Sequence, residues 1–213
     1  SVAIGHDALA TQNFTSATPS YNTAVGSQAG VAVTTGYNNT LVGGLSGDGI
    51  TTGHSNTTLG VSSLGINTTG IYNLALGISA LESNTTASYN TAVGANALDA
   101  NTTASNNTAV GYASLGVNTT GTQNVAVGAL ALDALTDADN NVALGYLSLS
   151  ADTLGSRSVA VGSHALTAQN FTSATDTYNT AVGFFAGISV TTGVQNTLIG
   201  GLAGDALTVG VRN

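Results

Sequence analysis

The sequence predicts an all-β fold, a parallel β-solenoid in which the chain winds through coils of nearly equal length. Three observations predict it. The 213 residues divide into twelve similar units that each begin with Asn or Ser. The fifth residue of every unit is Gly, and the fourth is always Val, Ile or Leu. A unit of this length is too short for helical repeats, which need about 30 residues or more.

The units follow one another at a spacing of seventeen residues, except that two of them have twenty-one. Most read approximately N-T-A-V-G-x-x-A-L-x-x-N-T-T-G-x-x, and positions are counted from the first residue of each unit. A single coil has no core of its own, so it can bury its Val and Leu side chains only against neighbouring coils. The units begin at Ser1, Asn22, Asn39, Asn56, Asn73, Asn90, Asn107, Asn124, Asn141, Ser158, Asn179 and Asn196.

The T-A-V triplet at positions two to four alternates as a short β-strand does, and the following Gly predicts a corner. A Gly that recurs in every unit indicates a backbone angle or a close approach that no Cβ tolerates. This glycine corner comprises Gly5, Gly26, Gly43, Gly60, Gly77, Gly94, Gly111, Gly128, Gly145, Gly162, Gly183 and Gly200.

The rest of the unit predicts a second short strand around the A-L pair at positions eight and nine, and then an N-T-T-G turn. Position eight is always Ala or Ser, which fits a narrow interior. Asn at position one and Thr at position thirteen should form ladders of side-chain hydrogen bonds from coil to coil. Twelve coils at ~4.8 Å each predict a rod about 55–60 Å long.

A longer period is superimposed on the short one. Residues 1–56 closely match residues 158–213, an offset of 157 residues. We therefore expect residues 1–213 to form one continuous solenoid domain that is a segment of a longer fibre.

The stretches S-V-A-I-G at Ser1–Gly5 and S-V-A-V-G at Ser158–Gly162 resemble the repeats of YadA-like heads in trimeric autotransporter adhesins. That resemblance implies a left-handed parallel β-roll wound as a homotrimer. The N-T-A-V-G units also resemble repeats of phage tail fibres and of bacterial surface fibre proteins.

Composition excludes several classes of partner and site. The net charge is −8 with two basic residues, which excludes the phosphate neutralisation that nucleic-acid binding needs. No run of apolar residues is long enough for a transmembrane helix. His6, His54 and His164 fall at different positions of the repeat, and no hydrolase, phosphate-loop or paired-carboxylate motif is present. The sequence thus predicts no enzyme activity, catalytic residue, cofactor or metal.

Three further patterns have both a functional and a structural interpretation. The stretches at Gly43–Gly49 and Gly200–Asp205 resemble a calcium repeat, but they are not tandem, so a packed turn is favoured. Acidic residues at position ten predict a solvated edge more than a cation-binding stripe. Nine N-x-S/T sequons could carry glycans, but Asn is also a good turn residue, which we favour. The sequons at position twelve are Asn67, Asn84, Asn101 and Asn118.

Large apolar residues at positions six and seven, just after the glycine corner, predict a subunit contact because extended apolar patches mark interfaces. The alternative is that they fill the interior at its widest corner. The predicted contact comprises Tyr112, Leu130, Tyr146, Leu147, Phe184 and Phe185, and the same column includes Leu45 and Leu202.

These patterns predict a structural or adhesive extracellular fibre segment, a rod, spacer or filament at a cell surface. Its expected partners are further copies of itself, as a homotrimer or larger fibre, and a host or surface receptor. A phage tail-fibre shaft, part of a virion, is one alternative. Ice or crystal-surface binding through the Thr ladder at position thirteen is another.

Overall fold

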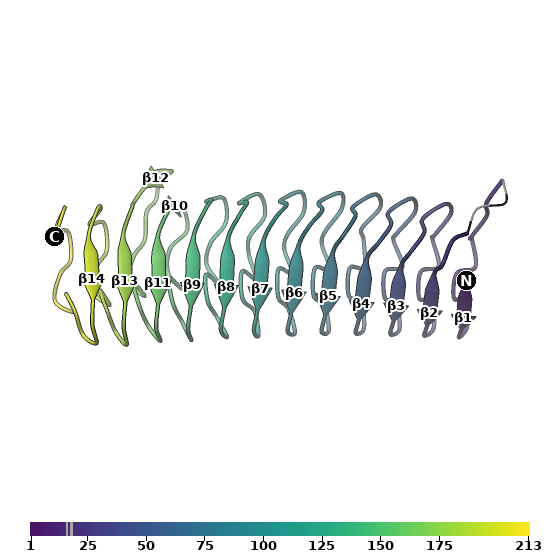
Figure 1. The fold of residues 1–213 in the computed structure, drawn as a ribbon, viewed down its shortest axis with the longest axis horizontal. Helices are drawn as coiled ribbons and strands as arrows, with labels where there is room; N and C mark the ends of the chain where they lie inside the picture. Colours follow the sequence, from purple (N-terminus) through teal and green to yellow (C-terminus); the bar gives the residue numbers. More distant parts are fainter. Residues whose placement is uncertain (16, 18) are drawn as a thin grey trace. The chain divides into compact units, whose positions relative to one another are not determined.

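A computed structural model describes residues 1–15, 17 and 19–213. The chain divides into two compact units, Ser1–Asn106 and Asn107–Asn213, each with six coils. Each unit is an all-β parallel solenoid with one short strand per coil in its main sheet (Figure 1). This arrangement confirms the fold class and the twelve coils that the sequence predicts.

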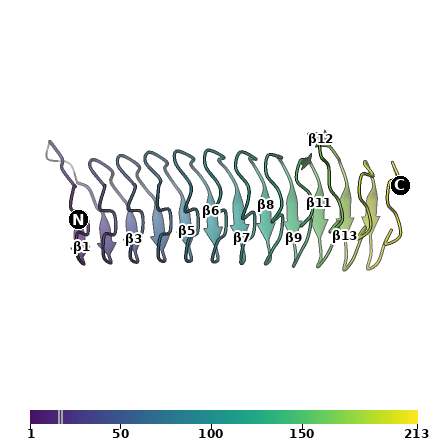
Figure 2. The same ribbon diagram turned by 180° about the vertical axis from the view of Figure 1, so that it is seen from behind.

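In the first unit the six main strands have three residues each and pair in parallel in the order β1-β2-β3-β4-β5-β6. The register places equivalent positions beside one another, for example Thr23 beside Thr40. Figure 2 shows the same strands from behind. The strands are β1 Val2–Ile4, β2 Thr23–Val25, β3 Thr40–Val42, β4 Thr57–Leu59, β5 Leu74–Leu76 and β6 Thr91–Val93.

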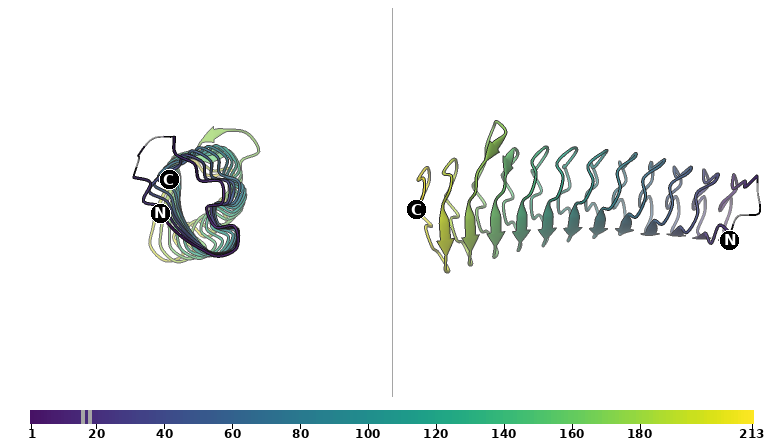
Figure 3. Two further views of the ribbon diagram at one scale, coloured as in Figure 1. Left: turned by 90° about the vertical axis from the view of Figure 1, so that its right-hand side faces the viewer. Right: turned by 45° about the horizontal axis from the view of Figure 1, so that its top comes forward.

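The second unit repeats this sheet and adds a small one. Its main strands pair in parallel in the order β7-β8-β9-β11-β13-β14. The extra strands, β10 and β12, pair in parallel where one coil is longer by four residues, and Figure 3 shows β12 outside the outline of the other coils of this unit. The strands are β7 Thr108–Val110, β8 Val125–Val127, β9 Val142–Leu144, β10 Gly155–Ser156, β11 Val159–Val161, β12 Thr175–Asp176, β13 Thr180–Val182 and β14 Thr197–Ile199.

From β2 onward the main strands bury position three and turn positions two and four outward, whereas all three residues of β1 are exposed. Ala92 in β6 has no exposed surface, whereas Thr91 and Val93 on either side of it are half-buried. The expectation that the aliphatic residue at position four belongs to the core is therefore wrong. Successive strand residues face opposite sides of a sheet, and the narrow interior accepts the small residue at position three.

The interior is filled by the residues at positions eight and nine. Ala97 and Leu98 are both fully buried. They lie in a turn segment, so the second strand predicted around this pair is wrong. The leucines at position nine have φ between 49° and 54°, a left-handed conformation incompatible with a strand.

Where position nine is Gly, a larger residue elsewhere fills its space. A Cβ added to Gly47 would lie 2.8 Å from Cδ2 of Leu41 and 2.9 Å from Cδ1 of Ile50. These two residues occupy positions three and twelve, where coils with Leu at position nine usually carry Ala and a polar residue. The interior volume of a coil is thus kept by compensating changes at three positions, as close packing requires.

Buried Asn side chains at position one connect the coils. Asn56 is fully buried, its Oδ1 accepts the Asn73 backbone N–H at 3.0 Å, and its Nδ2 donates to the Gly70 carbonyl at 2.9 Å. A second row at position twelve links Asn67 to Asn84, because Nδ2 of Asn84 donates to Oδ1 of Asn67 at 2.9 Å. The predicted Asn ladder is confirmed, and the second one was not expected.

The Thr ladder at position thirteen also links coil to coil, through the backbone. The hydroxyl of Thr51 donates to the carbonyl of Thr68 at 3.0 Å, and Thr68 donates to the carbonyl of Thr85 at 3.1 Å. The same contact recurs in the second unit, from Thr119 to the carbonyl of Thr136 at 3.2 Å. These hydroxyl protons are therefore already engaged within the protein.

Candidate interaction surface

The described part of the chain offers surfaces and no concave site. It contains no pocket and no group of three or more His, Asp or Glu side chains placed to hold a metal ion. The outward side chains of the coils are described next.

The glycine corner satisfies both of the conditions that predict it. All twelve glycines have φ between +127° and +146°. At ten of them an added Cβ would lie 2.2–2.5 Å from the carbonyl oxygen of the next coil's corner glycine. At Gly200 the nearest atom to an added Cβ is Cβ of Ala203 at 3.9 Å, so only the backbone angle constrains that residue.

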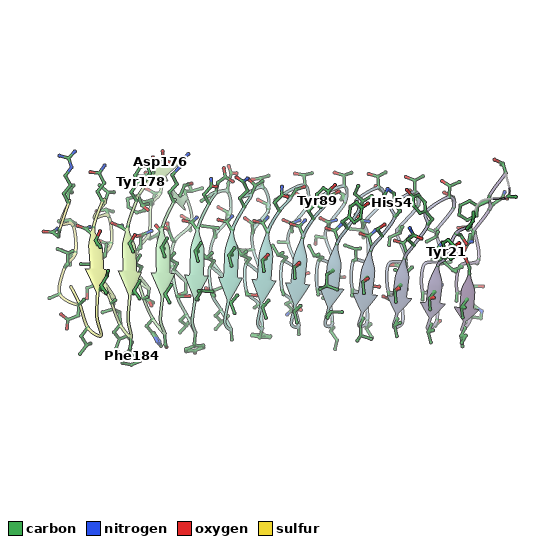
Figure 4. All side chains as sticks on the ribbon, in the orientation of Figure 1. Tyr21, His54, Tyr89, Asp176, Tyr178 and Phe184 are labelled. Carbon is green, nitrogen blue, oxygen red and sulfur yellow. The ribbon has the colours of Figure 1, made fainter. Side chains whose placement is uncertain are left out.

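Just after this corner, the predicted contact residues lie on the outside of the second unit. Tyr112, Tyr146 and Phe184 at position six are 57%, 50% and 56% exposed. Leu130, Leu147 and Phe185 at position seven are half-buried beside them. The alternative that this column fills the interior is thereby excluded. Figure 4 places Phe184 at the edge of the coils opposite Tyr178 and Asp176.

The aliphatic column at position four, which was expected in the core, adjoins this surface. Leu59 and Leu144 are exposed, and Val110 and Val161 are half-buried. All twelve coils keep Val, Ile or Leu at an outward position. We call positions four, six and seven together the apolar corner. The repetition of an aliphatic residue at position four was visible in the sequence. The sequence did not show that this residue points outward, because that depends on which face of the strand is buried.

Aromatic side chains form a row on the first unit that was not predicted from the sequence. Tyr37 stacks on His54 with ring centroids 4.4 Å apart, His54 meets Tyr72 edge to face at 5.7 Å, and Tyr72 stacks on Tyr89 at 5.3 Å. Figure 4 shows His54 and Tyr89 at the same edge. These residues occupy positions sixteen and seventeen of four successive coils. Their spacing of seventeen or eighteen residues, close to the length of one coil, is the feature of the sequence from which the row could have been predicted.

The histidines lie in different surroundings. His164 packs between Tyr146 and Phe185, with ring centroids 5.4 Å and 4.9 Å away. His6 lies 3.1 Å from the Asp7 carboxylate on an exposed surface. The structure does not bring His6 and His54 of the first unit into contact.

The acidic residues at position ten are less solvated than predicted. Asp48, Asp99 and Asp133 are half-buried, and burial raises the pKa of each carboxyl. Glu82 is half-buried too, and its charge contributes further to the raised pKa of Asp48 and of Asp99. Asp205 is exposed. Four of the five members of this column are thus only partly solvated, and none of the five is fully buried.

The sequons at position twelve face inward. Asn67, Asn84, Asn101 and Asn118 have no exposed surface. The amide of Asn67, for example, donates to the Gly70 carbonyl at 3.1 Å within its own coil. An oligosaccharide cannot reach such a side chain in the folded protein, so the structural interpretation of these four residues is confirmed.

One carboxyl is almost fully buried, at the coil where the extra strands occur. Asp152 is 1% exposed, and burial raises its pKa. Its Oδ2 accepts a hydrogen bond from Nε2 of Gln169 at 2.5 Å, and its Oδ1 accepts one from the Gly155 N–H at 3.0 Å. Nε2 of Gln169 also donates to Ser158 at 2.8 Å, while Asn179 donates to Oε1 of Gln169 at 2.8 Å. This network joins three coils of the second unit.

Comparisons of the sequence with protein-family models and curated proteins, and of the fold with solved structures, gave no match. Over the described ranges, no helix is long and apolar enough to cross a bilayer.

Proposed function

We propose that this chain is a structural or adhesive segment of an extracellular fibre, without catalytic activity, that acts as a spacer at a cell surface. One observation carries the proposal: the same contacts between neighbouring coils recur along the chain. The Asn and Thr ladders, the glycine corner and the position-nine leucines all serve that purpose. A repeat built in this way extends a surface along one direction.

Self-association is part of the proposal, and a homotrimer is the arrangement that we favour. The apolar corner supports it, because large apolar side chains arranged in a continuous column are typical of interfaces. The chain has only two basic residues, so ion pairs between copies can contribute little. A parallel copy would repeat the contact of the aliphatic residue at position four at each coil.

Sedimentation of single variants tests the association. Replacing Tyr146 or Phe184 by Ser should weaken it, and Ser27 and Ser163 show that position six accepts this residue. The matched control is Tyr178→Ser, an exposed aromatic residue at the opposite edge, in the last position of its coil, where Ser55 stands in another coil. A wild-type chain that is folded but monomeric at micromolar concentration contradicts self-association.

The spacer role is tested by displaying the chain on cells between a membrane anchor and a fluorescent label. Deleting residues 73–106, which are two complete coils, should bring the label about 10 Å closer to the membrane. Energy transfer to a lipid dye reports that distance. An unchanged distance would show that the chain does not hold the label away from the surface.

The alternative of an ice-binding Thr ladder loses support from the ladder's own hydrogen bonds. The hydroxyl protons of Thr51 and Thr68 are donated to backbone carbonyls of the next coil. Thermal hysteresis in a solution of the purified chain would favour that function over ours. A phage tail-fibre shaft shares the spacer role and differs only in the particle to which it belongs.

A further inference from the structure

We propose that Tyr72 and Tyr89 form an oxidative modification site, at which a one-electron oxidant joins the two side chains in a dityrosine cross-link between neighbouring coils. The proposal does not depend on the function proposed above. It starts from the geometry of the aromatic row on the first unit.

The two tyrosines are both accessible and adjacent. Tyr72 is 52% exposed and Tyr89 is 55% exposed, so an oxidant can reach either phenol. Their rings are stacked with centroids 5.3 Å apart and an interplanar angle of 14°. They occupy position seventeen of consecutive coils, which fixes their backbones side by side. The Tyr89 N–H donates to the carbonyl of Ile71 at 3.1 Å, which holds this register.

No other pair of tyrosine rings is in contact among the described residues. Tyr37 is separated from Tyr72 by the ring of His54. Tyr21 and Tyr178 occupy the equivalent last position of the two longer coils and are exposed, but no aromatic ring contact joins either to another tyrosine over the described ranges. The chain therefore places one tyrosine pair, out of seven tyrosines, in position to couple.

The coupling is balanced with hydrogen peroxide as the oxidant and a haem peroxidase as its catalyst. Each phenol loses one electron and one proton and becomes a neutral phenoxyl radical. The two unpaired electrons form a carbon–carbon bond between the ring carbons ortho to the hydroxyls, and the hydrogen on each of these carbons moves to the phenolic oxygen. The peroxide takes up two electrons and two protons and becomes two water molecules.

The geometry favours coupling within one molecule. The two rings are already stacked with centroids 5.3 Å apart, so the phenol nearest to either radical belongs to the same unit of the same chain. A bond between these side chains closes a covalent loop across two coils and restricts their separation on unfolding.

The experiment treats the purified full-length chain with a plant haem peroxidase and hydrogen peroxide. We expect dityrosine fluorescence in the fraction that runs as a single chain on a denaturing gel, with a yield per chain that does not change on dilution. Cleavage after Glu82, which separates the two tyrosines, should leave their peptides linked and lighter by two hydrogen atoms. Tyr72→Phe and Tyr89→Phe should each remove most of the fluorescence, because phenylalanine keeps the ring but forms no phenoxyl radical.

The matched controls are Tyr21→Phe and Tyr178→Phe, which should leave the yield unchanged. Fluorescence that persists in both Tyr72→Phe and Tyr89→Phe overturns the assignment. So does cross-linking found only in covalent dimers whose yield rises with protein concentration. Wild-type and variant far-ultraviolet spectra must agree, which confirms that the comparison is made between folded chains.

Discussion

Leucine at position nine makes two opposite contributions to the free energy of unfolding. A left-handed backbone costs a non-glycine residue about 1–2 kcal/mol, whereas full burial of a leucine side chain contributes about 1.5–3 kcal/mol. Leu98, with φ of 52° and no exposed surface, shows both. Burial outweighs the backbone cost, which explains why eight coils keep leucine in a conformation that it disfavours.

This balance predicts an unusual order of stabilities. Leu98→Ala should lower the free energy of unfolding by about 2–4 kcal/mol through the lost side chain. Leu98→Gly should cost about 1 kcal/mol less than that, because glycine accepts a positive φ. Urea unfolding measures both. The control is Ala97→Gly, next to it and without a positive φ, where glycine should destabilise. If alanine proves the better substitute at position 98, the left-handed backbone does not determine the order.

The glycine corner makes a second prediction at the same scale. An added Cβ at Gly128 would lie 2.5 Å from the Gly145 carbonyl oxygen, at a φ of +134°. Gly128→Val should therefore cost more than ~2 kcal/mol. Ala129→Val, one residue further on, should change stability by less than ~1 kcal/mol, since Val61 already occupies that position in another coil. Limited proteolysis should cut near the altered coil only; equal resistance of both variants would contradict the close approach.

At the scale of the element, the buried Asn ladder predicts a larger loss than an ordinary polar residue. Asn56→Ala removes the acceptor of the Asn73 N–H and the donor to the Gly70 carbonyl. The Gly70 carbonyl keeps the amide of Asn67, but the buried Asn73 N–H is left without a partner, which should cost about 1–3 kcal/mol in free energy of unfolding. Asn96→Ala is the control, because position seven is half-buried and carries Ala113 in another coil. Hydrogen exchange of the Asn73 amide should accelerate in the first variant; unchanged protection there would show that the ladder bond does not hold the coil.

The elements differ in how far the sequence specifies them. Periodicity was enough to predict the strand, the glycine corner and the ladder at Asn56, because each depends on one residue type repeated in register. The direction of position four was not predictable, since T-A-V has apolar residues on both faces and only the packed interior decides between Ala92 and Val93. The turn around Leu98 was missed because propensities give no sign of a buried leucine with a positive φ. The Tyr72–Tyr89 stack was not predicted, because it depends on the orientation of the two side chains, which their spacing in the sequence does not specify.

At the scale of the whole molecule, the carboxyl groups predict how stability depends on pH. Burial raises the pKa of Asp48, Asp99, Asp133 and Asp152 in the folded chain. Their stabilising contribution is therefore fully present below their ordinary pKa, near 4, and is lost as the pH rises through the folded values. We therefore expect the urea concentration at the unfolding midpoint to be higher at about pH 4 than at pH 7. Added salt should raise the midpoint at pH 7, because it screens the repulsion within a chain of net charge −8.

The nearly fully buried carboxyl should account for part of that dependence. Asp152→Asn should flatten the change in urea midpoint with pH, because an amide carries no charge into the interior, and Asn is the natural residue at this position in four other coils. Asp205→Asn, at an exposed carboxyl, should leave the profile unchanged. A midpoint that rises from pH 4 to pH 7 in the wild type would contradict the sign of the prediction.

The seventeen-residue coils contact one another through the same three groups, and this bears on how the number of coils can change by recombination in the gene. Any such coil presents its neighbour with a corner glycine, a threonine hydroxyl at position thirteen and an asparagine amide at position one. A recombination event that drops or copies fifty-one base pairs (seventeen codons) therefore keeps these three contacts in register at the new junction. The number of coils can change by whole units while these contacts are kept. In the second unit the exception is the longer coil that begins at Ser158. Its Gln169 donates to Asp152 in the preceding coil and accepts from Asn179 in the following coil, so the borders of this coil should resist such slippage.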